Sequence, residues 1–249
     1  MISPPLPGRN NTPIVQPTRT TGCPRLGPLA LMVSSRVDLR MIEKQASLAK
    51  AQRAPLMSRL YVSAGADDSM SVAGPMMGAP YAVAMMETLI AWGARSLLFF
   101  GWCGAISPEV AIGDIIVPTG SIIDEGTSRH YGIDTGRTSR AAPETVTKIE
   151  DMLTGQGLSF RKEMVWSTDA PFRETPEKVA AARRRGAIAV EMETSALFTA
   201  GRHLQVPVGA VLAVSDDLSS LTWKPGFKDK RFRSARRAVC EGFAGLCRE

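Results

Sequence analysis

Hydrophobic residues follow two different spacings along this chain, and the two alternate. Apolar runs that end at polar or glycine-rich stretches predict strands. Runs of this kind occupy residues 28–34, 60–64, 69–73, 95–100, 110–118, 158–166, 187–190 and 206–214. Helical composition or spacing marks residues 38–51, 79–92, 143–155, 175–185, 193–204 and 229–247. The alternation of strands and helices predicts an α/β fold.

The most informative stretch is a strand, a helix and a second strand in succession. A short apolar strand at 187–190 leads into a helix whose start carries Glu191 and Glu193. The apolar run VPVGAVLAV then ends at Asp216 and Asp217, where we expect the strand to break. Ligands bind beyond the carboxyl ends of strands in α/β sheets. These four carboxylates therefore stand where chemistry is expected.

Each of these carboxylates also has a structural interpretation. A Glu in the first turn of a helix complements the helix dipole, and an Asp after a strand often caps the next element. Asp217 either places a negative charge beside Asp216 or caps the turn that follows. The residues alone leave both interpretations open.

Small residues gather after the strand at 95–100. The sequence there reads GWCGAI, and the residues around Cys103 and Gly104 allow the backbone to approach a ligand or a neighbouring strand closely. A polar loop, DEGTSRHY, occupies 124–131. Glycines at a strand end are by themselves weak evidence of a binding site. This stretch indicates a site only in combination with the carboxylates.

Size and composition indicate a soluble globular protein. The chain has 249 residues, of which 44% are hydrophobic and 22% charged, which is enough for one α/β domain. No apolar run approaches the roughly 20 residues of a membrane span, and the first residues lack the apolar centre of a signal peptide. The four cysteines have no metal-like spacing. We expect a cytoplasmic protein that holds no metal and contacts no membrane.

The positive charge is concentrated near the N-terminus. The first 60 residues hold nine Lys or Arg but only two acidic residues, against a net charge of +6 for the whole chain. We expect an irregular basic arm over residues 1–27, with Arg9, Arg19 and Arg25, and one domain over 28–249. Such a section suits a phosphate-bearing ligand or the acidic face of another subunit. No recognition motif accompanies it, so nucleic acid is not an expected partner.

Two phrases of the sequence resemble the nucleoside phosphorylase family I, whose members cleave the N-glycosidic bond of nucleosides. One is VEMETSALF followed by AVSDD, and the other is GWCGAISPEVAIGDIIVP; the DEGTSRHY loop is also similar. The resemblance covers roughly residues 28–240. It implies a single-domain, three-layer αβα sandwich with a central mixed, partly barrel-like sheet. It also implies a homo-oligomer, either a dimer or a trimer of dimers, that serves purine salvage.

The resemblance also implies roles for individual residues. Glu193 holds the sugar hydroxyls, with Met192 under the ribose and Glu191 assisting. Asp216 protonates the departing base, which favours purine over pyrimidine substrates. Phe172 is the aromatic candidate against the base, although a loop anchor in the core is an alternative. Cys103 and Gly104 belong to the turn that approaches the substrate. Of the two histidines, His203 is expected to be structural, and His130 lies in the polar loop.

The expected phosphate site departs from the family pattern. The family's Gly-Asp-Pro-x-Arg turn is replaced by residues 34–40, SSRVDLR. Phe99 and Trp102 stand where the family carries an Arg and a Ser or Thr. Our candidates for binding phosphate are therefore Arg36, Arg40 and the helix start at Gly78.

The sequence as a whole predicts phosphorolysis of a purine nucleoside, with inorganic phosphate as co-substrate and no cofactor. Two alternatives remain. One is a nucleosidase that uses water, although residues 29–39 lack the water-activating Glu of such enzymes. The other is a non-catalytic nucleoside sensor, which Phe99 and Trp102 favour. A retained general acid at Asp216 argues against the sensor, because binding alone needs no acid.

Overall fold

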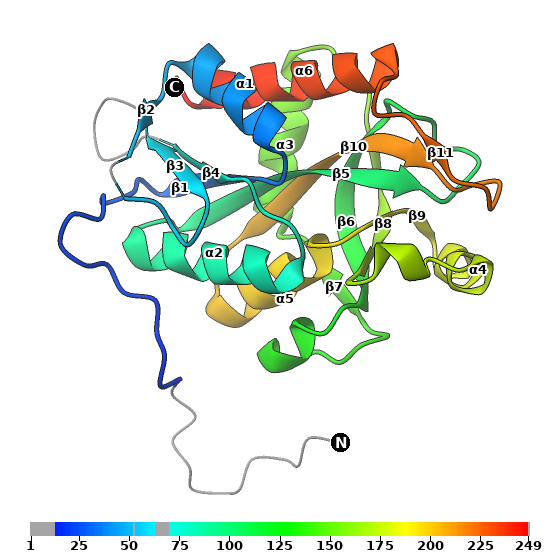
Figure 1. Ribbon diagram of the computed structural model, residues 1–249, viewed down its shortest axis with the longest axis horizontal. Helices are drawn as coiled ribbons and strands as arrows, with labels where there is room; N and C mark the ends of the chain where they lie inside the picture. The colour runs from blue at the N-terminus through cyan, green and yellow to red at the C-terminus, as the bar shows by residue number, and fades with distance from the viewer. Residues whose placement is uncertain (1–12, 52, 63–69, 249) are drawn as a thin grey trace, which may run out of the picture.

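A mixed β-sheet forms the middle layer of the molecule. The computed structural model describes residues 13–51, 53–62 and 70–248 (Figure 1). Its strands are β1 Leu29–Val33, β2 Ala49–Lys50, β3 Arg59–Val62, β4 Ser71–Gly74, β5 Ser96–Ala105, β6 Ile115–Asp124, β7 Thr138–Arg140, β8 Arg161–Thr168, β9 Ala187–Glu191, β10 Val208–Asp217 and β11 Lys224–Pro225. Its α-helices are α1 Arg36–Ala46, α2 Ala79–Trp92, α3 Pro143–Gly155, α4 Pro176–Arg184, α5 Thr194–Leu204 and α6 Lys230–Leu246, with 3₁₀ turns η1 Ser128–Tyr131 and η2 Pro171–Arg173.

Part of the sheet closes on itself. The strands β10, β6, β8 and β9 follow one another in the sheet, and β5 pairs with both ends of this series, in parallel with β10 and antiparallel with β9. The strands β1, β4, β3 and β2 continue from β5 as an open extension. The mixed, partly barrel-like sheet that the sequence predicted is therefore confirmed.

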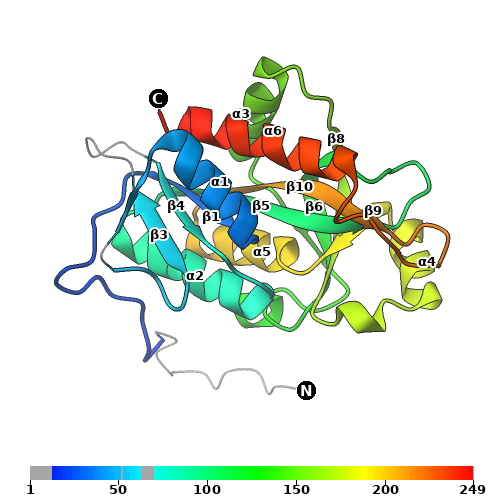
Figure 2. The ribbon, with the colours of Figure 1, turned by 45° about the horizontal axis from the view of Figure 1, so that its top comes forward.

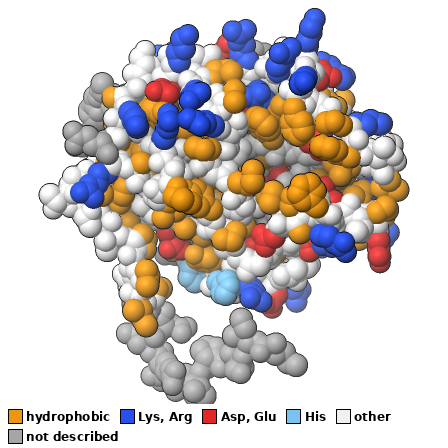
Figure 3. Space-filling view, viewed as in Figure 1, with side chains coloured by type: hydrophobic (Ala, Val, Ile, Leu, Met, Phe, Trp, Pro, Cys, Tyr) orange, Lys and Arg blue, Asp and Glu red, His pale blue; other side chains and the backbone are white. Residues whose placement is uncertain are grey.

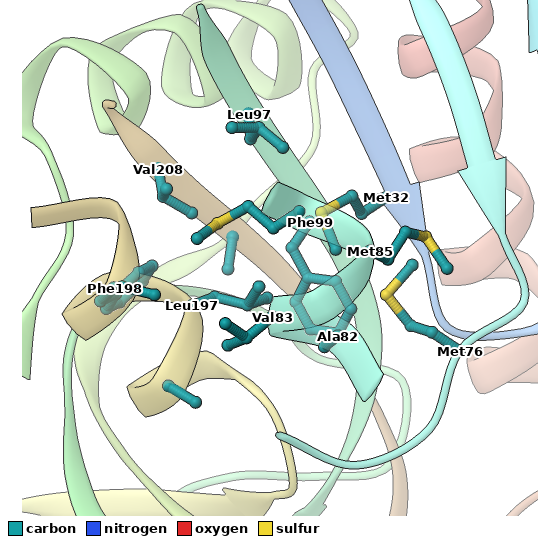
Figure 4. Close-up of a cluster of buried hydrophobic side chains, with 14 of the residues drawn as sticks. Met32, Met76, Ala82, Val83, Met85, Leu97, Phe99, Leu197, Phe198 and Val208 are labelled. Carbon is teal, nitrogen blue, oxygen red and sulfur yellow. The ribbon is translucent and has the colours of Figure 1, made fainter. Parts of the chain in front are cut away.

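Helices cover both faces of the sheet and complete the three layers. The helices α1, α3 and α6 lie on one face, and α2 and α5 lie on the other (Figures 1 and 2). Successive side chains of a strand point to opposite faces, so Phe99 of β5 enters the core beneath α2 and α5, whereas Phe100 enters the core beneath α6. Figure 4 shows Phe99 in the first of these cores, beside Leu197 and Met85. Full burial of such side chains contributes roughly 1.5–3 kcal/mol each.

Several element boundaries differ from the sequence prediction. The helix expected over 38–51 ends at Ala46, because Ser47 adopts a left-handed conformation and β2 then pairs with β3. The strand expected over 110–118 begins only at Ile115. A turn precedes it, in which Asp114 accepts a hydrogen bond from the backbone N–H of Ala111 and Gly113 has a φ of +96°.

The expected break at Ser215 was wrong. The strand β10 continues to Asp217, with a bulge between Val214 and Asp216, and pairs Asp216 with Gly104 of β5. The hairpin to β11 extends the pairing on the other side. The carboxylates at this strand end are thus held by backbone hydrogen bonds rather than by a loose turn.

The first described residues contain neither helix nor strand. Residues 13–27 run irregularly along the molecule before β1 (Figure 1), while residues 1–12 and Arg9 lie outside the described residues. Two hydrogen bonds to Trp92 join this stretch to the end of α2: its indole N–H donates to Thr18, and Leu26 donates to its carbonyl. Among the residues that the structure describes, no helix has the length and hydrophobicity that a membrane crossing requires.

Close contact between α5 and β10 depends on Gly201. A Cβ atom at this position would lie 2.4 Å from a methyl carbon of Val208 and 2.9 Å from the carbonyl oxygen of Val206. We expect Gly201→Ala to lower the free energy of unfolding by about 1–3 kcal/mol through overpacking. Denaturant unfolding measures this.

Gly245 of α6 is the matched control, because a Cβ atom there would meet nothing within 4 Å. Gly245→Ala is expected to be neutral or to stabilise by roughly 0.5–1 kcal/mol, because Ala has the higher helix propensity. Equal stability of the two variants would show that the contact of α5 with β10 tolerates an added methyl group.

Candidate active site

A cavity of about 520 Å³ opens where three neighbouring strands end. The carboxyl ends of β5, β9 and β10 meet there, as the parallel pairing of β5 with β10 requires. In Figure 3, hydrophobic side chains gather over this part of the molecule. The lining residues are Met77, Trp102, Cys103, Gly104, Pro171, Phe172, Glu174, Val190, Glu191, Met192, Ser215, Asp216, Leu218, Trp223 and Phe227. The cavity is thus apolar on most sides and acidic at a few points.

Glu191 fixes the corner between β9 and α5. One carboxylate oxygen accepts hydrogen bonds from the backbone N–H groups of Glu193 and Thr194, each at 2.7 Å, and the other accepts one from the Ser167 hydroxyl. These bonds satisfy donors that the start of a helix leaves free. Burial raises the pKa of Glu191, while the hydrogen bonds oppose that rise. Glu191 lines the cavity, and its two oxygens are occupied within the protein.

Glu193 lies next to this corner and is almost fully buried. One of its oxygens accepts a hydrogen bond of 2.5 Å from the backbone N–H of Gly78, at the start of α2. Burial, and after it the charge of Glu191, raise the pKa of Glu193 to about 8, although the N–H groups of Gly78 and Met192 act against the rise. Met192, between the two carboxylates, is among the lining residues, whereas Glu193 is not.

Asp216 stands at the end of β10 with a partner for each oxygen. The Ser215 hydroxyl is 2.6 Å from one oxygen, and the indole N–H of Trp223 donates to the other at 2.9 Å. Gly104 of β5 makes room for this carboxylate, because a Cβ atom there would lie 3.0 Å from an Asp216 oxygen and 2.6 Å from Leu218. The small residue after Cys103 therefore allows the acid to lie against the strand.

The sequence left two roles open for Asp217, a charge beside Asp216 or a turn cap, and its contacts are those of a cap. Its carboxylate accepts a 2.7 Å hydrogen bond from the backbone N–H of Ser219 and lies 3.4 Å from the ammonium of Lys224. Partial burial alone would raise the pKa of Asp217, but the Ser219 hydrogen bonds and the Lys224 charge keep it below its ordinary value. Asp217 caps the turn and does not line the cavity.

Phe172 and Cys103 both line the cavity, in different ways. The Phe172 side chain is 99% exposed on η2, so it is not the core anchor that the sequence allowed. Burial, with the nearby charge of Asp216, raises the pKa of the Cys103 thiol well above its ordinary value. The thiol is therefore neutral at physiological pH, which leaves Cys103 as a small wall residue.

Sequence reasoning missed a third carboxyl group in the cavity. Glu174 follows η2 and is half-buried beside Asp216. Burial and then the charge of Asp216 raise the pKa of Glu174 to about 7, with Lys178 acting in the opposite direction. One indication of this place was present in the sequence, because Glu174 follows two residues after Phe172, which was already a candidate for the site. Trp223 and Phe227 were also missed, because no spacing in the sequence connects the β11 hairpin with this cavity.

The predicted phosphate residues are not brought together at the cavity. Arg36 and Arg40 are exposed on α1 and do not line it. The Gly78 N–H group is occupied by Glu193. The phosphate roles of these three residues remain predictions.

Phe99 and Trp102 stand at the two positions where the sequence departs from the family, and neither is free to bind phosphate: one is buried in the core, and the other is hydrogen-bonded to Asp38. Phe99 is buried in the core between the sheet and α2 (Figure 4). Trp102 lines the cavity, and its indole N–H donates to Asp38 at 2.7 Å. Arg236 of α6 bonds the other oxygen of Asp38 and places its guanidinium 4.6 Å from the centre of the Trp102 ring. Removing one partner of such a buried pair typically costs about 3–5 kcal/mol.

Neither histidine lies in this cavity. His203 on α5 packs edge-on against Tyr131, with ring centres 5.5 Å apart, which is the structural role expected of it. His130 lines a separate hollow together with Asp169 and Glu87, whose carboxylate accepts a hydrogen bond from Tyr131.

Comparison with known proteins identifies a family. Residues 28–244 match the family model described as the phosphorylase superfamily. A curated relative, the DeoD-type purine nucleoside phosphorylase of Caldanaerobacter subterraneus subsp. tengcongensis, is 29% identical over 152 residues. The alignment covers 60% of this chain and 65% of that protein, so the chain spans just under two thirds of the length of that relative.

Solved structures show the same fold. Uridine phosphorylase from Vibrio fischeri ES114 superposes with a TM-score of 0.75 at 23% identity, over 90% of this chain and 94% of that one. The 5′-methylthioadenosine/S-adenosylhomocysteine nucleosidase of Campylobacter jejuni also gives a TM-score of 0.75, at 19% identity, over 89% of this chain and 99% of that one. A phosphorylase and a hydrolase thus share this architecture.

The raised pKa of Glu193 predicts a pH-dependent stability. A carboxyl whose pKa is raised in the folded state favours folding fully below its unfolded value of about 4.5 and loses that contribution as the pH rises through about 8. We expect the free energy of unfolding to fall between pH 5 and pH 8, and Glu193→Gln to flatten this slope. Denaturant unfolding at a series of pH values measures it.

Glu163→Gln, on an exposed position of β8, is the control and should leave the slope unchanged. An identical slope in the Glu193→Gln variant would mean that Glu193 does not take up a proton on folding.

Proposed function

The chain belongs to the phosphorylase superfamily, and we propose that it cleaves the N-glycosidic bond of a purine nucleoside, with inorganic phosphate as the co-substrate. The observation that carries this proposal is the convergence of Asp216, Glu191 and Met192 on one cavity, with Glu193 directly behind it. The name of the curated relative supports the same chemistry. The products are the free base and ribose 1-phosphate.

The reaction assigns one task to each side of the cavity. The bond between the anomeric carbon and purine N9 breaks, and its electron pair leaves with the base. The reacting form of Asp216 is the protonated one: it gives its proton to purine N7 and becomes a carboxylate, while a phosphate oxygen forms the new bond to the anomeric carbon. General acid catalysis of this kind contributes about 10²–10⁴ in rate.

The sugar belongs at the corner between β9 and α5. A carboxyl group, protonated or charged, can form hydrogen bonds with both hydroxyls of a cis-diol, and Glu193 is the residue that we assign to this task. Its neighbour Glu191 holds the backbone at the corner, so Glu191 acts on the sugar through Glu193. Met192 supplies the apolar surface under the ribose.

The base belongs between the aromatic residues and the acids. Phe172 and Trp223 are both exposed at the cavity and offer ring faces to a purine. Glu174, with a pKa of about 7, keeps a proton over part of the neutral range. A protonated Glu174 adds no second negative charge beside the carboxylate that proton transfer leaves on Asp216, so we assign Glu174 to the base side.

Hydrolysis is a second candidate function, and one observation favours it. None of the described residues that line the cavity is Lys or Arg, whereas phosphate is ordinarily bound by such cations. Water needs no cation. For phosphorolysis, we assign the missing cation to Arg36, Arg40 or the basic N-terminal section of a second copy.

A second copy is part of the proposal. We assign the protein to a homo-oligomer, a dimer or a trimer of dimers, in cytoplasmic purine salvage. Association would allow residues of one subunit, such as Arg19 or Arg25, to approach the cavity of another. Sedimentation equilibrium measures the oligomeric state independently of activity.

Phosphate dependence tests the nucleophile. Purine nucleoside is incubated with the protein in phosphate-free buffer, and phosphate is then titrated. We expect cleavage to require phosphate, with a weak phosphate affinity because Phe99 and Trp102 supply no charge. Chromatography distinguishes ribose 1-phosphate from free ribose.

Free ribose formed at full rate without phosphate would replace phosphorolysis by hydrolysis. Bound nucleoside that is cleaved under neither condition would identify a sensor.

Substitution of each aspartate at the end of β10 tests whether Asp216 is the general acid. Asp216→Asn should lower kcat/KM for a purine nucleoside by about 10²-fold or more, because proton donation is lost. Asp217→Asn is the matched control and should have a much smaller effect, because an Asn still accepts the hydrogen bond from Ser219. Steady-state kinetics measure both. A larger loss in the Asp217→Asn variant would transfer the acid role to that residue.

A further inference from the structure

Trp223 is exposed to solvent and is also hydrogen-bonded to a carboxylate of the cavity. Its side chain is 59% exposed, yet its indole N–H points inward and donates to a carboxylate oxygen of Asp216 at 2.9 Å. An exposed indole on a surface turn has water as an alternative hydrogen-bond partner. Its contact with a cavity carboxylate therefore needs a structural reason.

The β11 hairpin supplies that reason. Asp216 pairs with Pro225 and Asp217 with Lys224, and the N–H of Gly226 donates to the carbonyl of Ser215 at 2.9 Å. Glycine is required at 226, because a Cβ atom there would lie 2.6 Å from the Ser215 carbonyl oxygen. The backbone that follows Trp223 is thus fixed to the strand that carries Asp216.

Further contacts hold the tip of the hairpin. Asp217 accepts from the N–H of Ser219, and the guanidinium of Arg183 donates to the Ser219 carbonyl. On the other side, the Trp223 ring contacts Phe227 with centroids 6.4 Å apart, and Phe227 contacts Trp102 at 6.3 Å. The indole is therefore held at the cavity by its own hairpin and by an aromatic row, without help from a substrate.

The two oxygens of Asp216 differ in how firmly they are held. The Ser215 hydroxyl carries one proton and has two acceptors in reach, Asp216 at 2.6 Å and the Cys103 carbonyl at 3.2 Å. An indole N–H is a donor only, so the bond from Trp223 has a fixed direction. Trp223 is the partner that defines the orientation of the carboxyl group.

We propose that Trp223 is a positioning residue for the glycosidic cleavage: its indole N–H orients the Asp216 carboxyl group and stabilises the carboxylate that proton transfer leaves behind. This inference rests on the proposed function. When the Asp216 O–H bond breaks and the N7–H bond of the base forms, the negative charge remains on Asp216. A donor fixed at 2.9 Å stabilises that charge.

The experiment uses Trp223→Phe, which keeps an aromatic ring at the rim and removes only the donor. We expect kcat for an ordinary purine nucleoside to fall roughly tenfold, as the loss of one hydrogen bond to a charged group predicts. KM should change little, because the ring remains. With p-nitrophenyl β-D-ribofuranoside, whose leaving group departs without protonation, the rate should stay near that of the wild type.

A double-mutant cycle shows whether Trp223 acts through Asp216. In the Asp216→Asn background, Trp223→Phe should cause no further loss, because the group that it positions is already absent. Independent losses that multiply, or equal losses on both substrates, would overturn the inference, as would an unchanged kcat in the single variant.

Trp166→Phe is the matched control. Its indole N–H also donates to a carboxylate, that of Asp124 at 3.2 Å, but neither residue lines the cavity. Thermal unfolding of all variants confirms that they are folded. Loss of activity in Trp166→Phe equal to that in Trp223→Phe would mean that the effect is a general consequence of removing an indole, and would overturn the inference. A wild-type protein that cleaves no nucleoside overturns the proposed function itself, and the role of Trp223 with it.

Discussion

The site depends on the way in which β5 pairs with three other strands. It runs parallel to β1 and β10, and its last residues, Gly104 and Ala105, turn to pair antiparallel with β9. This pairing closes part of the sheet and brings the ends of β9 and β10 to the same place. The carboxylates of Glu191 and Asp216 belong to different strands and meet only because β5 lies between them.

Two glycines of β5 make room for neighbouring side chains where the sheet closes. Gly101 leaves space for the ring of Phe99, to which a Cβ atom would come within 2.7 Å, and Gly104 leaves space for Asp216. The glycines that looked like weak evidence in the sequence are therefore steric requirements of the core and of the site.

Local patterns predicted the parts of the structure that depend on local interactions. The helices α2 and α3 begin and end where the sequence indicated, because Pro and Gly mark their ends. The placement of Glu191, Met192 and Asp216 at one edge followed from strand order. Arg236 and its partner Asp38 are 198 residues apart, and no spacing in the sequence reports such a contact.

The strand boundary at Ser215 shows a related limit. A Ser-Asp-Asp sequence is polar and favours a turn, yet backbone pairing with β5 and β11 on either side keeps it extended. Tertiary hydrogen bonds thus outweigh local preference at the residues to which we assign the chemistry. For the same reason Trp223 and Glu174 were recognisable only once their hairpin and turn were placed beside the cavity.

Phe99 and Trp102, the two residues that depart from the family pattern, are each held in place by their own surroundings. Phe99 is enclosed by the core, and its ring needs the glycine at 101. Trp102 is held from behind by Asp38, whose charge is in turn balanced by Arg236. An Arg at position 99 would bury a charge in an apolar core, and a Ser or Thr at position 102 would deprive Asp38 of its indole donor. Under the proposed function, phosphate is therefore bound by groups other than these two, and it is the nucleophile, more than the proposed acid or sugar contact, that separates phosphorolysis from hydrolysis.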